Sequence, residues 1–170
     1  MTLPILASIV LPALIIGALA YYFFNTHLKN ENNKRNFELS KESRKHTLPL
    51  QLQAYERVTI FLERINPSSL LVRTKPIGED KENYKTLLVK TIEQEYEHNL
   101  SQQIFIDDAC WNVIVSSKNA TTNIISNIAN DNTIKTAQEM REGILKKMLE
   151  TAPPSSTALS YIKKEVLKLL

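Results

Sequence analysis

The sequence predicts an all-α protein: an N-terminal transmembrane helix continued by a helical stalk, then a cytoplasmic bundle of about five helices. One uncharged apolar run opens the chain, and the excess positive charge lies directly after it. Only three glycines occur in 170 residues, which disfavours folds rich in tight turns. We expect an anchor at 1–24, a charged stalk at 25–48 and a helical domain at 49–170.

The predicted anchor is the run LPILASIVLPALIIGALAYYFF, residues 3–24, which contains no charged side chain. About 20 apolar residues in a helix cross the hydrocarbon layer of a bilayer. Tyr21 to Phe24 place aromatic rings at one end, where such rings favour the interface. A cleaved signal peptide, cut after Ala18-Leu19-Ala20, is the alternative. The anchor is favoured because no Lys or Arg precedes the run, and the run continues past that site.

Charge in the predicted stalk indicates the orientation. Residues 25–46 carry six basic and three acidic side chains, which accounts for the whole net charge of +3, and residues 47–170 are balanced. Basic residues beside a span prefer the cytoplasmic side, so we expect the N-terminus outside and the domain in the cytoplasm. Lys29, Lys34 and Arg35 are candidate contacts for lipid headgroups. A neutral domain argues against nucleic acid as a partner.

The stalk is expected to end near Leu48-Pro49, because the residue before a proline disfavours the α region. Residues 49–65 then form an amphipathic helix that stops at Asn66-Pro67. Glu56 and Glu63 lie opposite its apolar face, and Ile60 lies with them. The residues on the apolar face are Gln51, Ala54, Tyr55, Val58, Phe61, Leu62 and Ile65.

Four further helices are expected. Residues 80–98 form one helix, and residues 104–130 form the longest one of the domain. Thr133 is expected to cap a helix that runs to Thr151, and a last helix begins near Thr157. The long helix carries a heptad-like seam of Cys110, Ile114, Ser117, Thr121, Ile124 and Ile128. The inward residues of the helix to Thr151 are Ile134, Ala137, Met140, Ile144, Leu145 and Met148.

No pattern in the sequence predicts catalysis, so we expect a non-enzymatic protein with no cofactor. Glu95-x-x-His98 has metal-ligand spacing, but a metal site needs three or four ligands. Asp107 and Asp108 are explained by the favourable end of a helix dipole. Cys110 is the single cysteine, so an intramolecular disulfide is impossible, and its place on the seam favours a buried structural thiol.

The polar side of residues 49–65 is the candidate interaction face: Glu56, Arg57, Ile60, Glu63 and Arg64. Our first hypothesis is a protein-interaction or scaffold module that binds another protein or itself. The alternative is an enzyme or small-ligand binder with its site between helices, near Glu56, Arg57, Glu63 and Arg64. Three C-terminal lysines could instead lie on a membrane surface, although packing on the bundle is favoured: Lys163, Lys164 and Lys168.

The stretch LPLQLQAYERVTIFLERINPSSLLVR, Leu48 to Arg73, resembles a block in small, uncharacterised, membrane-anchored proteins of Bacteroidetes-type bacteria. Those proteins share an N-terminal span, a charged stalk and a helical C-terminal region. The resemblance implies a bacterial inner-membrane protein and says nothing of its chemistry.

Overall fold

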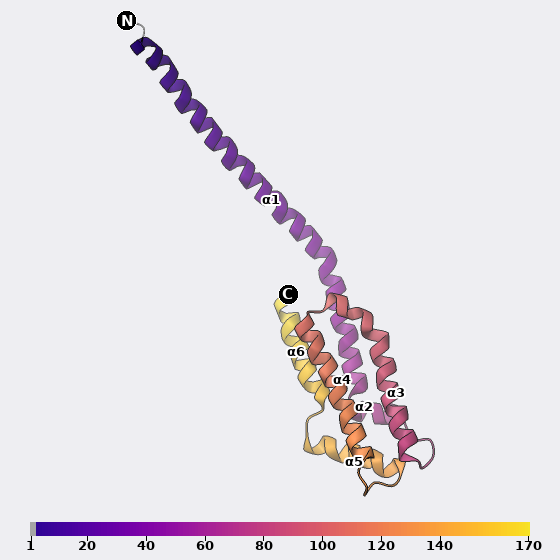
Figure 1. Cartoon of the computed structure of the whole chain (residues 1–170). Helices are drawn as coiled ribbons and strands as arrows, with labels where there is room; N and C mark the ends of the chain where they lie inside the picture. The colour runs from indigo at the N-terminus through magenta and orange to yellow at the C-terminus, as the bar shows by residue number, and fades with distance from the viewer. Residues whose placement is uncertain (1–2) are drawn as a thin grey trace. The chain divides into compact units, whose positions relative to one another are not determined.

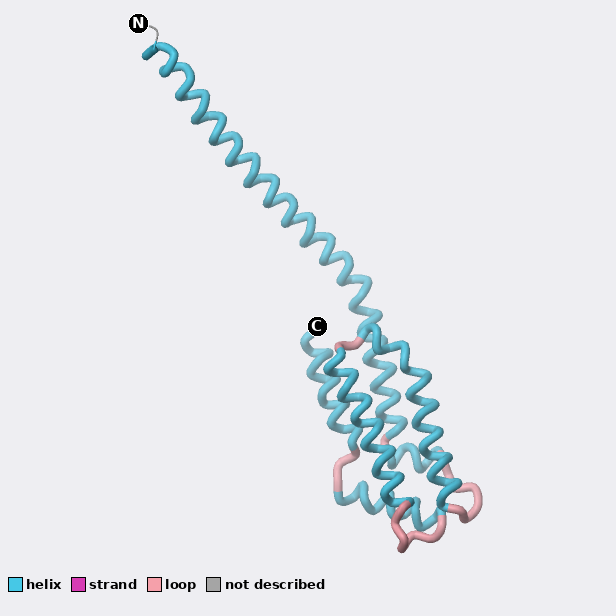
Figure 2. The backbone as a smooth tube through the Cα atoms, in the orientation of Figure 1, coloured by secondary structure: helices cyan, strands magenta, loops and turns pink. Residues whose placement is uncertain are grey.

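The computed structural model describes the backbone of residues 3–170. It does not describe the side chains of residues 3–16, 18, 20, 28, 30, 32 and 33. The chain divides into two compact units, Met1–Thr47 and Leu48–Leu170. All the regular elements in the described range are helices (Figures 1 and 2). They are α1 (Leu3–Ile65), α2 (Pro67–Arg73), α3 (Lys81–Asn99), the 3-10 helix η1 (Leu100–Phe105), α4 (Asp108–Ala129), α5 (Ala137–Glu150) and α6 (Pro154–Leu169).

The described part of the first unit is the N-terminal part of helix α1, and the helix continues to Ile65 in the second unit. The helical backbone expected for the anchor and the stalk is confirmed from Leu3 onward. Among the residues described, no helix combines the length and apolarity needed to cross a bilayer. The expected span at residues 3–24 falls largely on side chains outside the description, so membrane anchoring stays a prediction.

The expected helix end at Leu48-Pro49 is wrong, because α1 continues through Pro49 to Ile65. Proline fixes φ near the helical value, although inside a helix its ring also crowds the carbonyl four residues earlier. Its missing N–H removes one hydrogen bond, to the carbonyl four residues earlier, at Lys45. Lys45 is exposed, and water can bind a carbonyl in such a place at small net cost.

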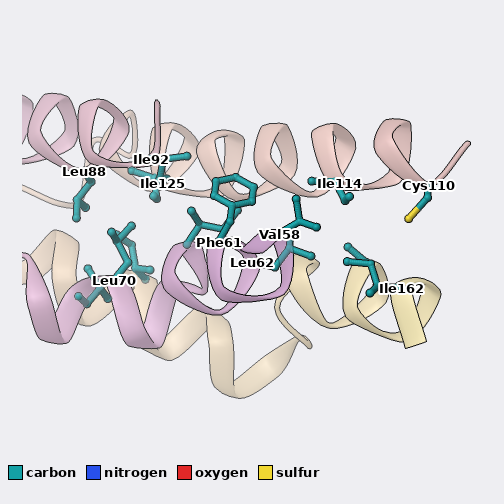
Figure 3. Close-up of a cluster of buried hydrophobic side chains, with 14 of the residues drawn as sticks. Val58, Phe61, Leu62, Leu70, Leu88, Ile92, Cys110, Ile114, Ile125 and Ile162 are labelled. Atoms are coloured by element: carbon teal, nitrogen blue, oxygen red, sulfur yellow. The ribbon is translucent and has the colours of Figure 1, made fainter. Parts of the chain in front are cut away.

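The second unit is built on the apolar face of residues 49–65. Every residue predicted for that face is buried, except Gln51, which is half-buried. Figure 3 shows Val58 and Phe61 of α1 pointing toward Ile114 and Ile125 of α4. Burying one such side chain contributes about 1.5–3 kcal/mol, so this helix face is the main apolar contribution of α1 to the core.

Helix α2 and the loop after it close one end of the unit. Asn66 ends α1 and caps α2, since its side-chain oxygen accepts a hydrogen bond from the N–H of Ser68 at 3.1 Å. The short apolar stretch after it, whose type the sequence left open, is helical, and Leu70 and Leu71 are buried. Helix α5 lies across this same end, against α2 (Figures 1 and 2).

The heptad-like seam of α4 is correct for its first four residues, Cys110 to Thr121, and wrong for its last two. Ile124 and Ile128 are half-buried, whereas Ile125 and Ala129 are fully buried. A straight α-helix has 3.6 residues per turn and drifts from a seven-residue repeat, so the buried stripe moves by one residue. The helix also starts later than expected: residues 100–105 form η1, and Asp107 caps α4 by accepting from the N–H of Ala109 at 2.9 Å.

The N-cap of helix α5 lies three residues after the predicted cap, Thr133. Thr136 is the N-cap, and its hydroxyl oxygen accepts from the N–H of Glu139. Glu139 accepts in return from the N–H groups of Lys135, at 2.6 Å, and Thr136, at 3.1 Å, which lowers its pKa. Thr133 instead donates both its N–H and its hydroxyl to Asp131. Leu145, predicted to point inward, is exposed.

Helix α6 begins at Pro154, before the expected Thr157, and packs on α4. Ala158 and Ile162 are buried, while Leu167 and Leu170 are 72% and 81% exposed. The helix therefore packs on the bundle, as expected, but leaves part of its apolar side uncovered.

Replacing Thr136 with alanine should lower the stability of the domain by about 1 kcal/mol, because the N–H of Glu139 loses its acceptor. Urea unfolding followed by circular dichroism measures the loss. The matched control is Thr133→Ala, on the exposed loop, which we expect to cost less than about 0.5 kcal/mol. An equal or larger effect of the control would contradict the assignment of the cap.

Candidate functional site: two grooves beside helix α1

The five residues of the candidate interaction face are all exposed. Four of them line an open groove of about 650 Å³ between α1 and α3, the α1/α3 groove; Glu63 does not. The groove lies on the side of residues 49–65 opposite the core, as the amphipathic pattern predicts. Its walls are Gln53, Glu56, Arg57, Ile60 and Arg64 of α1, and Glu95, His98 and Asn99 of α3.

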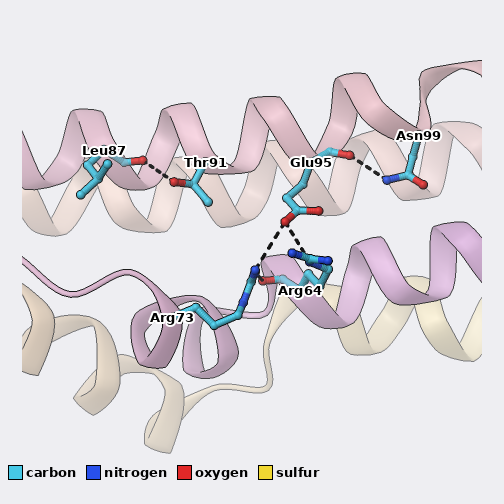
Figure 4. Close-up of polar contacts among 6 residues, drawn as sticks. All are labelled: Arg64, Arg73, Leu87, Thr91, Glu95 and Asn99. Atoms are coloured by element: carbon cyan, nitrogen blue, oxygen red, sulfur yellow. Dashed lines mark hydrogen bonds and ion pairs between the residues drawn. The ribbon is translucent and has the colours of Figure 1, made fainter.

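A charge network joins the walls of the α1/α3 groove (Figure 4). Glu95 Oε1 lies 2.8 Å from Arg64 Nε and 3.4 Å from Arg73 Nη1. Arg73 Nη2 also donates a hydrogen bond to the carbonyl of Arg64 at 2.7 Å. The Glu95 side chain is only 16% exposed, which strengthens its charge-assisted contacts relative to those of a fully solvated pair. The network thus holds Arg64 in place and links the end of α1, α2 and α3.

Glu95 is therefore engaged by cations in this structure, which weakens the metal interpretation of Glu95-x-x-His98. The positive charges of the two guanidinium groups repel a metal cation from the same carboxylate. Nor do three His, Cys, Asp or Glu side chains gather into a possible metal site in the part that is described. His98 instead lies on the wall of the α1/α3 groove.

Three other charged residues of the candidate interaction face lie outside the charge network of Glu95, Arg64 and Arg73. Within residues 3–170 as described, no ion pair involves Glu56, Arg57 or Glu63. Ile60 is 49% exposed between them. The face therefore offers charges of both signs around one apolar side chain.

A buried lysine was missed by the sequence analysis. Lys118 of α4 is 9% exposed, and its Nζ lies 2.7 and 2.9 Å from the two carboxylate oxygens of Glu93 on α3. The same ammonium sits 4.6 Å from the ring centroid of Tyr96, a cation–π contact. Tyr96 in turn contacts Phe61 and Trp111, each with ring centroids 6.0 Å apart. Only the pairing of α3 with α4 reveals this cluster, whose contacts are structural.

Cys110 is fully buried, and burial raises its thiol pKa to about 11, with smaller contributions from the Glu165 and Asp107 carboxylates. The thiolate is the reactive form of cysteine, so this thiol is a poor nucleophile at neutral pH. Asp107 serves as the cap of α4 and Asp108 occupies its first turn, as expected from the helix dipole.

A second groove runs along the other side of α1, between α1 and α6, and has a volume of about 490 Å³. We call it the α1/α6 groove. Ile162, Val166 and Leu167 give it an apolar wall, and Lys163 lies on the same wall. Glu56 lines both grooves, so the outer face of α1 is a ridge between a polar and an apolar recess.

Cys110 should react slowly with iodoacetamide in the folded protein. At pH 8 its thiolate fraction is about a hundredfold below that of an ordinary cysteine, and burial slows access further. Mass spectrometry should show little labelling until urea unfolds the chain. Rapid labelling without denaturant would contradict the burial of this thiol.

The raised pKa of Cys110 also affects stability. The free energy of unfolding should fall as the pH rises from about 9 toward 11, since only the thiol of the unfolded chain ionises in that range.

The comparisons with known proteins bear on the family and not on the chemistry. No curated protein and no solved structure matches the chain. Residues 2–169, almost the whole chain, match the family of unknown function DUF7935. The protein, an all-helical chain with two grooves beside one helix, belongs to that family.

Proposed function

We propose that this protein is a non-enzymatic interaction module, anchored in a bacterial inner membrane, whose helical domain binds another protein through the α1/α3 groove. One observation carries the proposal: four exposed residues of one helix face line an open groove together with three residues of α3. Drug-sized ligands are usually bound in enclosed, mainly apolar pockets. An open groove with charged walls fits a protein segment better.

The residues of the groove suggest what such a segment carries. Arg57 is exposed and has no ion pair among the described residues, so it offers a fork of donors to a carboxylate. Ile60 gives an apolar contact beside it, and apolar anchors surrounded by polar side chains are common at interfaces. We therefore propose a partner segment with one apolar side chain packed on Ile60 and one acidic side chain paired with Arg57.

The membrane part of the proposal rests on the sequence. Residues 3–24 serve as the single span, with the N-terminus outside the cytoplasm and the helical domain inside. Lys29, Lys34 and Arg35 are exposed on α1 and contact anionic headgroups. The bacterial inner membrane follows from the resemblance of residues 48–73 to membrane-anchored bacterial proteins.

The alternative function is binding or conversion of a small anionic ligand between helices. It is favoured by Arg57 and His98, which line the same groove and which could donate hydrogen bonds to one anion. Saturable binding of a small dicarboxylate that Arg57→Glu abolishes would favour this alternative. Under the interaction proposal, the protein partner depends on Ile60 as well as on Arg57.

A reporter fused after Leu170 tests the topology. Green fluorescent protein, which fluoresces only when it folds in the cytoplasm, should be fluorescent and sediment with the membranes. Deletion of residues 1–24 should release the fusion into the soluble fraction. Alkaline phosphatase in the same position should be inactive; an active phosphatase would place the domain outside the cytoplasm. A purified chain that lacks its first 20 residues would indicate a cleaved signal peptide.

A photo-crosslinking amino acid placed at Ile60 of the full-length protein tests the interaction. Illumination of membranes should join it to a partner protein, and Arg57→Glu should reduce the yield at least fivefold, because the partner carboxylate meets a like charge. The matched control is Lys90→Glu, the same reversal on α3 outside this groove. No adduct at Ile60, or an adduct equally insensitive to both reversals, would contradict the proposed groove.

A further inference from the structure

We propose that the α1/α6 groove is a homodimer interface, in which Glu56 of each chain pairs with Lys163 of the other. The occupant of this groove is thus a second copy of the same chain. The surface differs from the α1/α3 groove, which is proposed for a different protein, and the two sites meet only at Glu56.

Charge complementarity within the groove is the first argument. Glu56 lies on the α1 wall and Lys163 on the α6 wall, and both are exposed. Neither takes part in an ion pair in the part of the chain that is described. One wall of the groove therefore carries an unpaired acid and the other an unpaired base.

Two-fold symmetry makes these walls complementary to themselves. A two-fold axis parallel to the helices keeps every residue at its level along the bundle and exchanges the two walls. The acidic wall of one chain then meets the basic wall of the other, and both ion pairs form at once, as an isologous interface requires. This axis is chosen because it keeps the Leu48 ends of both domains on the same side, as the proposed membrane anchor requires. No other step of the dimer proposal rests on the anchor.

The apolar residues between the charges supply the contact area. Leu167 is 72% exposed on α6, and Val166 and Leu52 are half-buried on opposite walls. A second copy would cover all three at once. The hydrocarbon stem of Lys163 can cover apolar surface while its ammonium reaches Glu56 of the partner subunit. A charged pair that frames an apolar centre is the usual arrangement of an interface.

Charge reversal tests the pairing in the full-length protein in detergent, by analytical ultracentrifugation. We expect a reversible dimer whose dissociation constant rises at least tenfold with Glu56→Lys, and equally with Lys163→Glu. The double variant E56K/K163E should return it to within threefold of the wild type. Glu97→Lys and Lys90→Glu, the same reversals on α3, serve as matched controls and should leave the constant unchanged. Circular dichroism confirms that each variant is folded.

Cross-linking in trans supplies an independent measurement. A tagged Glu56→Cys chain and an untagged Lys163→Cys chain, mixed in detergent, should be joined efficiently by a short bismaleimide. Either variant alone should give much less product, because the native Cys110 is buried and identical positions are not paired.

The proposal is overturned by a wild-type chain that stays monomeric at the highest concentration measured. It is equally overturned by a dimer indifferent to both reversals, or by a double variant as weak as the single ones. A monomer that instead cross-links through position 163 to another protein would assign the groove to that protein. Adducts at Ile60 would persist in each of these cases if the α1/α3 groove functions as proposed, so the two failures are distinguishable.

Discussion

Burial of the apolar face of residues 49–65 is the constraint on which the rest of the domain depends. Val58, Phe61 and Leu62 fill the space in front of α4, and the ring of Phe61 also contacts Tyr96 of α3. Helix α4 packs also against α6, α3 and α5, and the apolar face of α1 completes the same buried cluster. Once this face is buried, the opposite face of the same helix is exposed and lines the α1/α3 groove. The α1/α6 groove lies at the margin of the buried face, where Tyr55 lines it.

The neighbours of α1 differ in chemistry, and this difference makes the two grooves unlike. Helix α3 brings Glu95, His98 and Asn99 to one side, so the recess there is polar. Helix α6 brings Ile162, Val166 and Leu167 to the other side, so the recess there is mostly apolar. A single exposed ridge with Glu56 and Ile60 therefore separates surfaces suited to different partners, which is why we assign a foreign protein to one and a second copy to the other.

Three ion pairs among the described residues of this domain join different helices, whereas the others lie within one helix. Glu95 links α3 to both α1 and α2 through Arg64 and Arg73, and Lys118 links α4 to α3 through Glu93. These pairs are partly shielded from water, and isolated exposed pairs are worth little by comparison. The pairs of Glu95 also explain why the Glu-x-x-His motif is poorly suited to a metal, because its carboxylate is already paired with two arginines.

The sequence by itself determined the helical class, the buried face of residues 49–65 and the exposure of Glu56, Arg57, Ile60, Glu63 and Arg64, because helical periodicity separates the faces of one element locally. The sequence predicted helix ends less well. The helix end predicted at Pro49 and the cap predicted at Thr133 were both wrong, because a helix end depends on the surrounding backbone. Only the tertiary structure decided which helices flank α1, and hence that Glu63 lies outside the groove and Glu95 inside it. The burial of Lys118 and the shift of the α4 stripe to Ile125 likewise follow from helix pairing, which periodicity within one helix does not encode.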